Sequence, residues 1–189
     1  MDDSSLAKAI EGSTYVVHVA SPYPSTQPKN ENELIEPAVQ GTMAILNACR
    51  TNKVKRLVIT SSMASVIYPS EEDYPDDKFT EEMWTNPDKQ GLSAYAKSKV
   101  LAEKAAWDFC EKLPADEKIE LVTILPGFVI GPSLCGPGFT SAKAIQFIMS
   151  GRGLPRMSFA VVDVRDCAMA HLKAIQVDDA KDKRYILCD

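Results

Sequence analysis

The sequence predicts an α/β protein in which helices cover both faces of a parallel sheet, the doubly wound class. Short runs of Val, Ile and Leu alternate with longer segments of helical periodicity, and this order is typical of parallel strands joined by crossover helices. The strand-like runs are apolar at nearly every position, which predicts strands buried on both faces. The 189 residues, 45% of them hydrophobic, suffice for one core, so we expect a single domain.

The first half of the chain contains two predicted strands and one helix. Residues 15–20 form an apolar run that ends at Ser21-Pro22, and residues 56–60 form the second run. Between them, Pro37 suits the first turn of a helix, and apolar residues recur at helical spacing as far as Arg50. Residues 65–91 are polar and rich in proline, and they are long enough to form a functional loop or lid.

The second half repeats the alternation. We expect a helix to begin at Ser93 or Ala94 and to end near residue 113, because the segment is rich in Ala, Lys, Glu and Leu. A third buried strand is predicted at residues 119–125, before Pro126-Gly127. The remaining predicted elements are a helix at 140–150, a strand at 159–164, a helix at 165–175 and a strand at 184–188.

Charge and composition argue against several classes of function. The net charge is −5, and Lys and Arg are interspersed with acidic residues, so we expect no nucleic-acid partner. No apolar run approaches the roughly 20 residues that span a bilayer, and the first residues are acidic and polar, unlike a secretory signal. The five cysteines are spaced singly, without a metal-binding cluster. We therefore expect a reduced, cytoplasmic protein without a metal site or membrane contact.

Tyr95 and Lys99 are four residues apart in a predicted helix, so they lie on one face of it. A tyrosine with a pKa near 10 is a poor proton carrier at neutral pH. A cation within about 4–6 Å lowers this pKa, so we expect Lys99 to adjust Tyr95 for proton transfer to a carbonyl group. The same spacing is common on exposed helix faces, and the pair alone is compatible with a structural role.

Hydroxyl groups follow the second predicted strand, at Thr60, Ser61 and Ser62. Serines also end strands for reasons of turn chemistry alone. However, ligands in doubly wound sheets bind at the carboxyl ends of the strands, and the third strand ends in the backbone-shaping Pro126-Gly127. We therefore expect the strand ends and the Tyr95 helix to meet at one edge of the sheet.

Together these motifs resemble the extended short-chain dehydrogenase/reductase family, which includes the NAD-dependent epimerases and dehydratases. The narrower similarity is to its dihydroflavonol reductase and cinnamoyl-CoA reductase branch. The resemblance extends over nearly the whole chain, and it rests on residues 18–22, Thr60-Ser61-Ser62, Tyr95-x-x-x-Lys99, residues 102–107, 125–132 and 162–171.

The resemblance implies a reductase that uses NADP or NAD, with NADP favoured, to interconvert a small-molecule carbonyl and a secondary alcohol. Tyr95 matches the general acid of the family. Lys99 matches the residue that lowers the pKa of this tyrosine and binds the nicotinamide ribose. Ser62 matches the hydroxyl that orients the substrate carbonyl.

Further cofactor contacts are implied by the same resemblance. Val19, Ala20 and Ser21 match the strand end beside the adenosine half of the cofactor. Pro126 and Val129 match the stretch that lines the nicotinamide. The implied fold is Rossmann-like, and the hydride chemistry belongs to the cofactor.

Two features depart from the family pattern. The family begins with strands and a Gly-x-x-Gly-x-x-Gly loop that binds the pyrophosphate, and this sequence has no such loop. We therefore expect an incomplete, N-terminally truncated Rossmann-like domain over residues 1–189, in which 133–189 include part of a substrate-binding region. The second departure is Ile67, which stands where plant dihydroflavonol reductases carry a polar residue that recognises the flavonoid, so flavonoid specificity is not expected.

Three functions remain open from the sequence. The first is the reductase, and the second is a non-catalytic shortened form that cannot bind dinucleotide and docks on a full-length relative. The third is a sugar-nucleotide epimerase or dehydratase, which uses a similar Ser, Tyr and Lys set. Missing strands would also expose an apolar sheet edge. His18 and His171 lie in apolar elements and are expected to be packing histidines.

Overall fold

A four-stranded parallel sheet forms the centre of the molecule. The computed structural model describes residues 3–23, 28–75, 78–134, 136, 140–151 and 160–188. The sheet has the order β1-β2-β3-β6, from Tyr15–His18 (β1), Arg56–Thr60 (β2), Glu120–Pro126 (β3) and Lys183–Leu187 (β6). A smaller parallel pair is formed by Phe128–Ile130 (β4) and Val161–Asp163 (β5). The predicted strand at 159–164 is confirmed for Val161–Asp163, and Phe159 lies outside the described residues.

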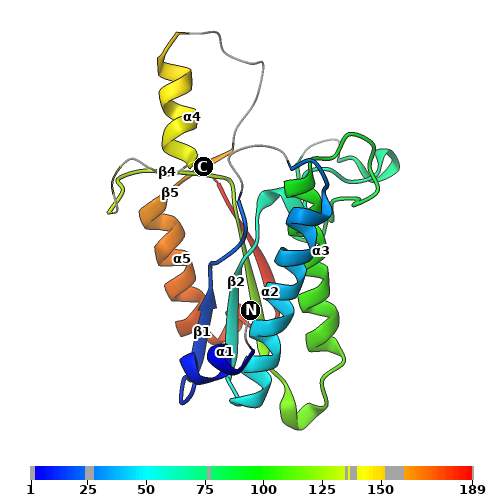
Figure 1. The fold of residues 1–189 in the computed structure, drawn as a ribbon, viewed down its shortest axis with the longest axis vertical. Coiled ribbons are helices and arrows are strands. Elements are labelled where there is room, and N and C mark those ends of the chain that lie inside the picture. Colours follow the sequence, from blue (N-terminus) through cyan, green and yellow to red (C-terminus); the bar gives the residue numbers. More distant parts are fainter. Residues whose placement is uncertain are drawn as a thin grey trace.

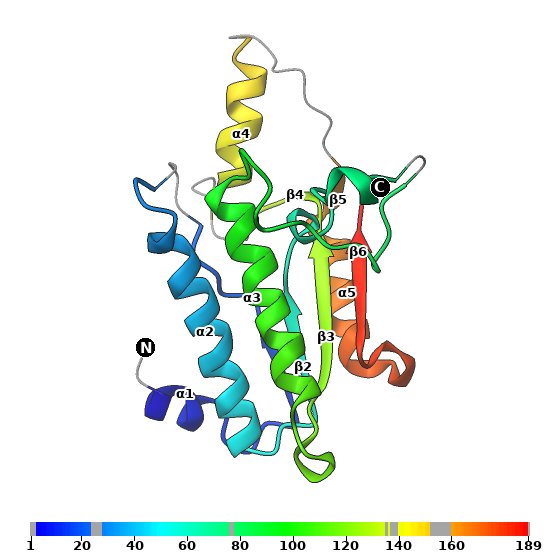
Figure 2. The same ribbon diagram turned by 90° about the vertical axis from the view of Figure 1, so that its right-hand side faces the viewer.

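Helices cover both faces of this sheet, so the predicted doubly wound class is confirmed. Helices α2 and α3 pack side by side on one face, and α5 lies against β2 and β3 on the other (Figures 1 and 2). The helices are Asp3–Ala9 (α1), Asn32–Thr51 (α2), Ala94–Glu111 (α3), Thr140–Met149 (α4) and Val164–Gln176 (α5). Short 3₁₀ turns occur at Met63–Ser65 (η1), Glu71–Asp73 (η2), Ala115–Glu117 (η3) and Asp178–Ala180 (η4).

The two central strands are buried on both faces, as their continuous apolar sequences predict. Leu57 and Leu121 face the layer of α2 and α3, and Val58 and Val122 face α5. One charged residue interrupts this pattern. Arg56 is buried in β2, where it pairs with Glu120 at 2.7 Å and donates hydrogen bonds to carbonyl oxygens at the C-terminal end of α5.

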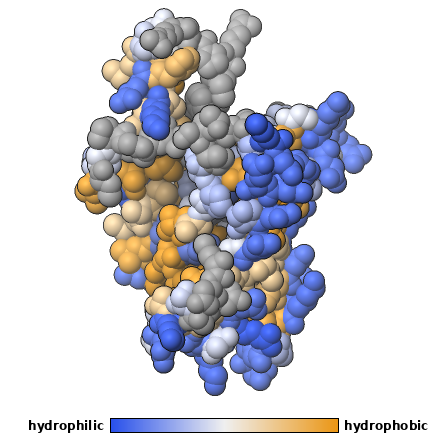
Figure 3. Space-filling model, in the orientation of Figure 1, coloured by the Kyte–Doolittle hydropathy of each residue, from blue (hydrophilic) through white to orange (hydrophobic). Residues whose placement is uncertain are grey.

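The edge strand β1 departs from the prediction. Tyr15 and Val17 are 40% and 39% exposed, so this strand is buried on only one face. The reason is its position at the end of the described sheet, where α5 packs against β2 and β3 instead. Figure 3 shows hydrophobic residues gathered on this face, over α5 and β1, and Met169 and Leu172 of α5 are also about half exposed. An exposed apolar sheet edge is therefore present, as predicted.

Some element boundaries were wrong. Helix α2 begins at Asn32, so Pro37 lies in its second turn and not in the first turn as predicted. The Asn30 side chain accepts a hydrogen bond from the Asn32 backbone N–H at 3.0 Å, and Leu34 and Ile35 in the added turn are buried. Burial and this polar contact offset the backbone hydrogen bond that the proline cannot donate. Helix α1 and strand β4 were not predicted, because each is too short to show a clear period.

The long segment between β2 and α3 is held at both ends by hydrogen bonds. The Thr85 hydroxyl donates to the Ala64 carbonyl oxygen at 2.6 Å, and the Thr85 backbone N–H donates to that of Ser65 at 2.8 Å. The Asn86 N–H donates to the Tyr68 carbonyl oxygen at 2.8 Å. The segment is therefore an anchored loop that returns to the end of β2. No helix in the described part of the chain has the length and apolar character to cross a membrane.

Candidate active site

The carboxyl ends of β1, β2 and β3 lie at the same end of the molecule as the N-terminus of α3 (Figures 1 and 2), and the predicted catalytic residues come from these elements. Ser93 caps α3, since its Oγ accepts the Ala96 N–H at 3.1 Å, and Tyr95 follows in the first turn. Ser62 lies two residues after the end of β2 and caps η1 by accepting the Ala64 N–H at 3.2 Å. Interaction with the Ser62 side chain lowers the pKa of the Tyr95 phenol.

Lys99 lies one helical turn after Tyr95 and is only 8% exposed. Its Nζ is 5.9 Å from the centroid of the Tyr95 ring and donates a hydrogen bond to the Thr60 carbonyl oxygen at 3.3 Å. Burial lowers the pKa of Lys99 to about 8, although the Glu103 carboxylate acts in the opposite direction. The structure thus brings Ser62, Tyr95 and Lys99 together as predicted.

One predicted effect within this group was wrong. We expected Lys99 to lower the pKa of Tyr95, but burial of the phenol raises it. The interaction with Ser62 lowers this pKa, and Tyr23, whose ring meets the Tyr95 ring edge-on at 4.7 Å, raises it. The physical reason is burial of the phenol, which disfavours the charged phenolate more than its neighbours favour it.

Two of the predicted cofactor residues share a small cavity with Lys99. Ala20 and Ser21, just after β1, line it together with Lys99, and the remaining lining residues include His18, Thr60 and Glu103. An ammonium group has three N–H donors, and among the described residues Thr60 accepts one of them. The other donors suit a ligand rich in hydroxyl groups, such as a nucleotide ribose. Val19 is exposed and does not line this cavity.

Pro126 and Gly127 pass close to the Ser62 turn, which is formed by Ser62 and the η1 residues Met63–Ser65. A side-chain carbon added to Gly127 would lie 2.3 Å from the Ala160 carbonyl oxygen and 3.3 Å from the sulfur of Met63. Only glycine therefore fits between β4 and β5 at this point. Because Met63 follows Ser62 directly, the ends of β2 and β3 converge here, as the sequence predicts.

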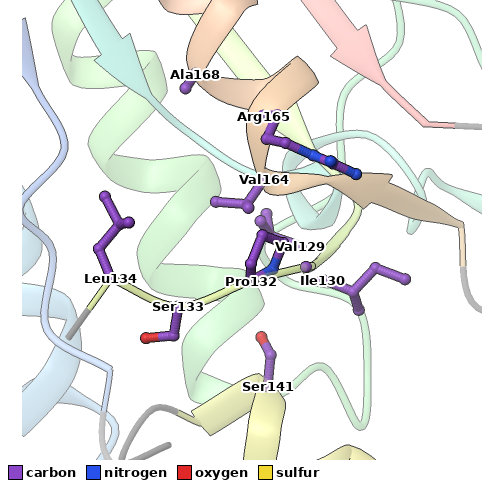
Figure 4. Close-up of a pocket in the computed structure, with 10 residues that line it drawn as sticks. Val129, Ile130, Pro132, Ser133, Leu134, Ser141, Val164, Arg165 and Ala168 are labelled. Carbon is purple, nitrogen blue, oxygen red and sulfur yellow. The ribbon is translucent and has the colours of Figure 1, made fainter. Parts of the chain in front are cut away.

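Val129 lines a different cavity, of about 630 Å³. Its walls are the segment from Val129 to Leu134, Ser141 of α4, and the first turns of α5 (Figure 4). This volume lies within the range of small-molecule sites, and the lining is largely apolar. Lys99 is not among its lining residues, so the structure does not bring Val129 and Lys99 into one cavity.

The sequence did not predict that three residues surround Lys99: Thr60, His18 and Glu103. Thr60 provides the carbonyl oxygen that Lys99 binds, and its hydroxyl is hydrogen-bonded to His171 at 2.7 Å. His171 also bonds to the Cys167 carbonyl oxygen, so both of its ring nitrogens have partners within the fold. His18 lines the cavity with Lys99, and burial and the Lys99 charge lower its pKa. Glu103 is the third, and its spacing four residues after Lys99 is the signal that could have identified it.

Known proteins are similar to the chain in both sequence and structure. A model of the NAD dependent epimerase/dehydratase family matches residues 1–188. A cinnamoyl-CoA reductase from Medicago truncatula is 36% identical over 191 residues, which cover 99% of this chain and 57% of that protein. Anthocyanidin reductase from Arabidopsis thaliana is 34% identical over 207 residues, with coverage of 99% and 58%.

A solved structure of another reductase is also similar to the chain. The crystal structure of yeast methylglyoxal/isovaleraldehyde reductase complexed with NADPH matches with a TM-score of 0.85 and 30% sequence identity, covering 98% of this chain and 59% of that one. The chain therefore spans little more than half the length of the relatives that it matches.

Proposed function

Since the chain belongs to the NAD dependent epimerase/dehydratase family, we propose that its site serves an NAD(P)-dependent oxidoreductase that reduces a small-molecule carbonyl to a secondary alcohol. The observation that carries the proposal is the arrangement of Ser62, Tyr95 and Lys99 at the carboxyl ends of the strands. The reductases among the similar proteins support this reaction, and the NADPH complex of the yeast reductase favours NADP over NAD.

The site residues divide the work as follows. A nicotinamide cofactor, when bound, supplies the hydride. Tyr95 holds the proton for the carbonyl oxygen at its phenol, and its raised pKa keeps this proton in place at neutral pH. Ser62 orients the substrate oxygen beside the phenol. The Lys99 ammonium group, over the Tyr95 ring, stabilises the phenolate that remains after proton transfer.

Cofactor contacts are proposed for the residues that surround this group. Lys99 and Tyr95 would hold the nicotinamide ribose through the remaining donors of the ammonium group and the phenol. Val19, Ala20 and Ser21 would contact the cofactor at the end of β1, and Pro126 and Val129 would line the nicotinamide. Residues 133–189 are proposed to include part of the substrate-binding region, to which the large cavity beside α4 and α5 belongs.

A second candidate is a non-catalytic protein that docks on a full-length relative. The exposed apolar edge of β1 favours it, because the outer side of an apolar edge strand is a ready template for association. For either function we propose a cytoplasmic location, since Cys49, Cys110, Cys167 and Cys188 are free thiols.

A titration of the purified chain with NADPH and NADH separates the two candidates. Nicotinamide fluorescence should report binding in the micromolar range, with NADPH tighter, if the strand ends hold the cofactor. No binding up to millimolar concentrations contradicts the oxidoreductase and leaves the docking protein. Turnover of nucleotide sugars instead of aromatic aldehydes or ketones would assign the chain to epimerase or dehydratase chemistry.

Tyr95→Phe tests the proton donor. The variant keeps the ring and removes the hydroxyl, so carbonyl reduction should fall by about 100-fold or more even at saturating NADPH. Tyr15→Phe is the matched control, because Tyr15 lies at the start of β1 and should retain full activity. Turnover of Tyr95→Phe at the rate of the unmodified protein is incompatible with the proposed role.

A further inference from the structure

A buried carboxylate lies directly behind the proposed site. Glu103 is 2% exposed and follows Tyr95 and Lys99 along one face of α3, at intervals of four residues. Lys99 and Glu103 line the same small cavity. A carboxylate this far from water requires several hydrogen-bond donors, and the mechanism derived above does not use it.

Its donors come from three elements that surround the site. The Ser61 hydroxyl donates to Glu103 at 2.5 Å, and the Thr123 hydroxyl in β3 donates at 2.8 Å. Arg184 Nε in β6 donates at 2.8 Å and forms a buried ion pair. Trp107 Nε1, one turn along α3, lies at 3.4 Å. The carboxylate therefore connects α3 to β3, to β6 and to the residue that follows β2.

Arg184 extends this connection to the anchored loop. Its Nη1 donates to the carbonyl oxygens of Glu81 and Met83, and its guanidinium group stacks on the Trp84 ring at 3.6 Å. The next residue, Thr85, donates to the carbonyl oxygens of Ala64 and Ser65 in the turn that follows Ser62. The Ser62 turn is thus held from Ser61 on one side and from Thr85 on the other, and both connections lead to Glu103.

We propose that Glu103 is a positioning residue of the Tyr95–Lys99 site: its carboxylate fixes the Ser62 turn through Ser61 and Arg184 and places a negative charge beside the Lys99 ammonium group. The inference rests on the proposed function, because it assigns Glu103 a role through those residues. Arg184 balances the charge of Glu103 in the fold, and Glu103 in turn offsets part of the burial that disfavours the charged form of Lys99.

The surroundings of Lys99 determine how this role is measured. The titratable groups that face it are Tyr95 and Glu103 from α3 and His18 from β1, and the Thr60 carbonyl oxygen faces it from β2. Of these groups, Glu103 supplies the negative charge. Removal of this charge should therefore lower the pKa of Lys99, whereas loss of a neutral neighbour of Glu103 should not.

The experiment is an NMR titration of Lys99 in the full chain with ¹³C-labelled lysine, assigned with Lys99→Arg. In Glu103→Gln the pKa of Lys99 should fall by about one unit relative to the unmodified chain. Thr123→Val is the matched control, since it removes one hydrogen bond to the same carboxylate and keeps both charges. It should leave the pKa of Lys99 unchanged, although both variants lose stability.

A second variant covers the case in which Glu103→Gln leaves Arg184 unpaired and does not fold. Glu103→Gln combined with Arg184→Met removes both buried charges, and it should show the same downward direction for Lys99. An unchanged pKa of Lys99 in either folded variant overturns the proposal and leaves Glu103 with a purely structural role. The readout needs neither cofactor nor turnover, so failure of the chain to bind NADPH contradicts the proposed function and not this result.

Discussion

Replacement of Lys99 by Met should change how the stability of the chain depends on pH. Burial holds the pKa of Lys99 at about 8, against 10.5 for a free lysine. Between these two values the unfolded chain binds more protons than the folded chain, so stability rises with pH across this window. Because one pKa unit corresponds to about 1.4 kcal/mol, the full gain attributable to Lys99 is about 3 kcal/mol. Lys99→Met lacks this gain.

The assay is urea denaturation of both proteins at several pH values from 7 to 10.5. The free energy of unfolding of the unmodified chain, minus that of Lys99→Met, should increase by about 3 kcal/mol over this range. The lost hydrogen bond to Thr60 lowers the stability of the variant at every pH below the pKa of Lys99 and does not reverse this trend. A difference that stays constant or falls with pH would refute the conclusion that burial lowers the pKa of Lys99.

Lys97 on the same helix provides a control of opposite sign. Its ammonium group donates to Glu31 at 2.8 Å, and this hydrogen bond raises the pKa of Lys97. A raised pKa contributes stability that is lost as the pH rises through it. The difference between the unmodified chain and Lys97→Met should therefore not increase between pH 7 and 10.5.

Two further predictions concern the frame of the site. Gly127→Ala places a carbon 2.3 Å from the Ala160 carbonyl oxygen and should lower the free energy of unfolding by about 2 kcal/mol or more, measured by urea denaturation. Gly41→Ala, with nothing within 4 Å, should raise it by about 0.5–1 kcal/mol, and equal effects at both glycines would contradict the steric argument. Arg56→Met leaves carbonyl oxygens of α5 and Val177 without their donor and should cost about 3 kcal/mol, with faster amide hydrogen exchange at the end of α5; unchanged exchange there would argue against this role.

The sequence predicted the parts of the fold that depend on local pattern. Strands β2 and β3 are continuous apolar runs, and α3 and α5 have clear helical composition, so each was located within about two residues. The exposure of β1 was not predictable from its own residues. Val17 is as apolar as Val58, and only its place at the end of the strand order decides that one is exposed and the other buried.

For the site, the spacing of residues within one helix predicted which side chains share a face, but the charges in the sequence did not predict the direction of the Tyr95 pKa. Tyr95 and Lys99 had to share a face of α3, and the strand ends had to meet beside it. The direction of the Tyr95 pKa depends on burial and on the neighbouring Ser62 and Tyr23, and none of these is encoded in the spacing. Arg184 illustrates the same limit, because its contacts with Glu103 and Met83 join segments separated by 81 and 101 residues.

The cost of burying Lys99 is itself an argument about function. An exposed lysine on α3 would avoid the roughly 3 kcal/mol that separates a pKa of about 8 from one of 10.5, and a methionine would fill the space without any charge. A residue kept at such a cost is more often found where a charge is used than where it only packs. Glu103 fits the same reasoning. Its carboxylate opposes the lowering of the Lys99 pKa by burial, and Ser61, Thr123 and Arg184 donate hydrogen bonds to it. If Lys99→Met proves more stable than the unmodified chain at pH 7 and also fails to bind NADPH, Lys99 lowers the stability of the fold and is required for cofactor binding.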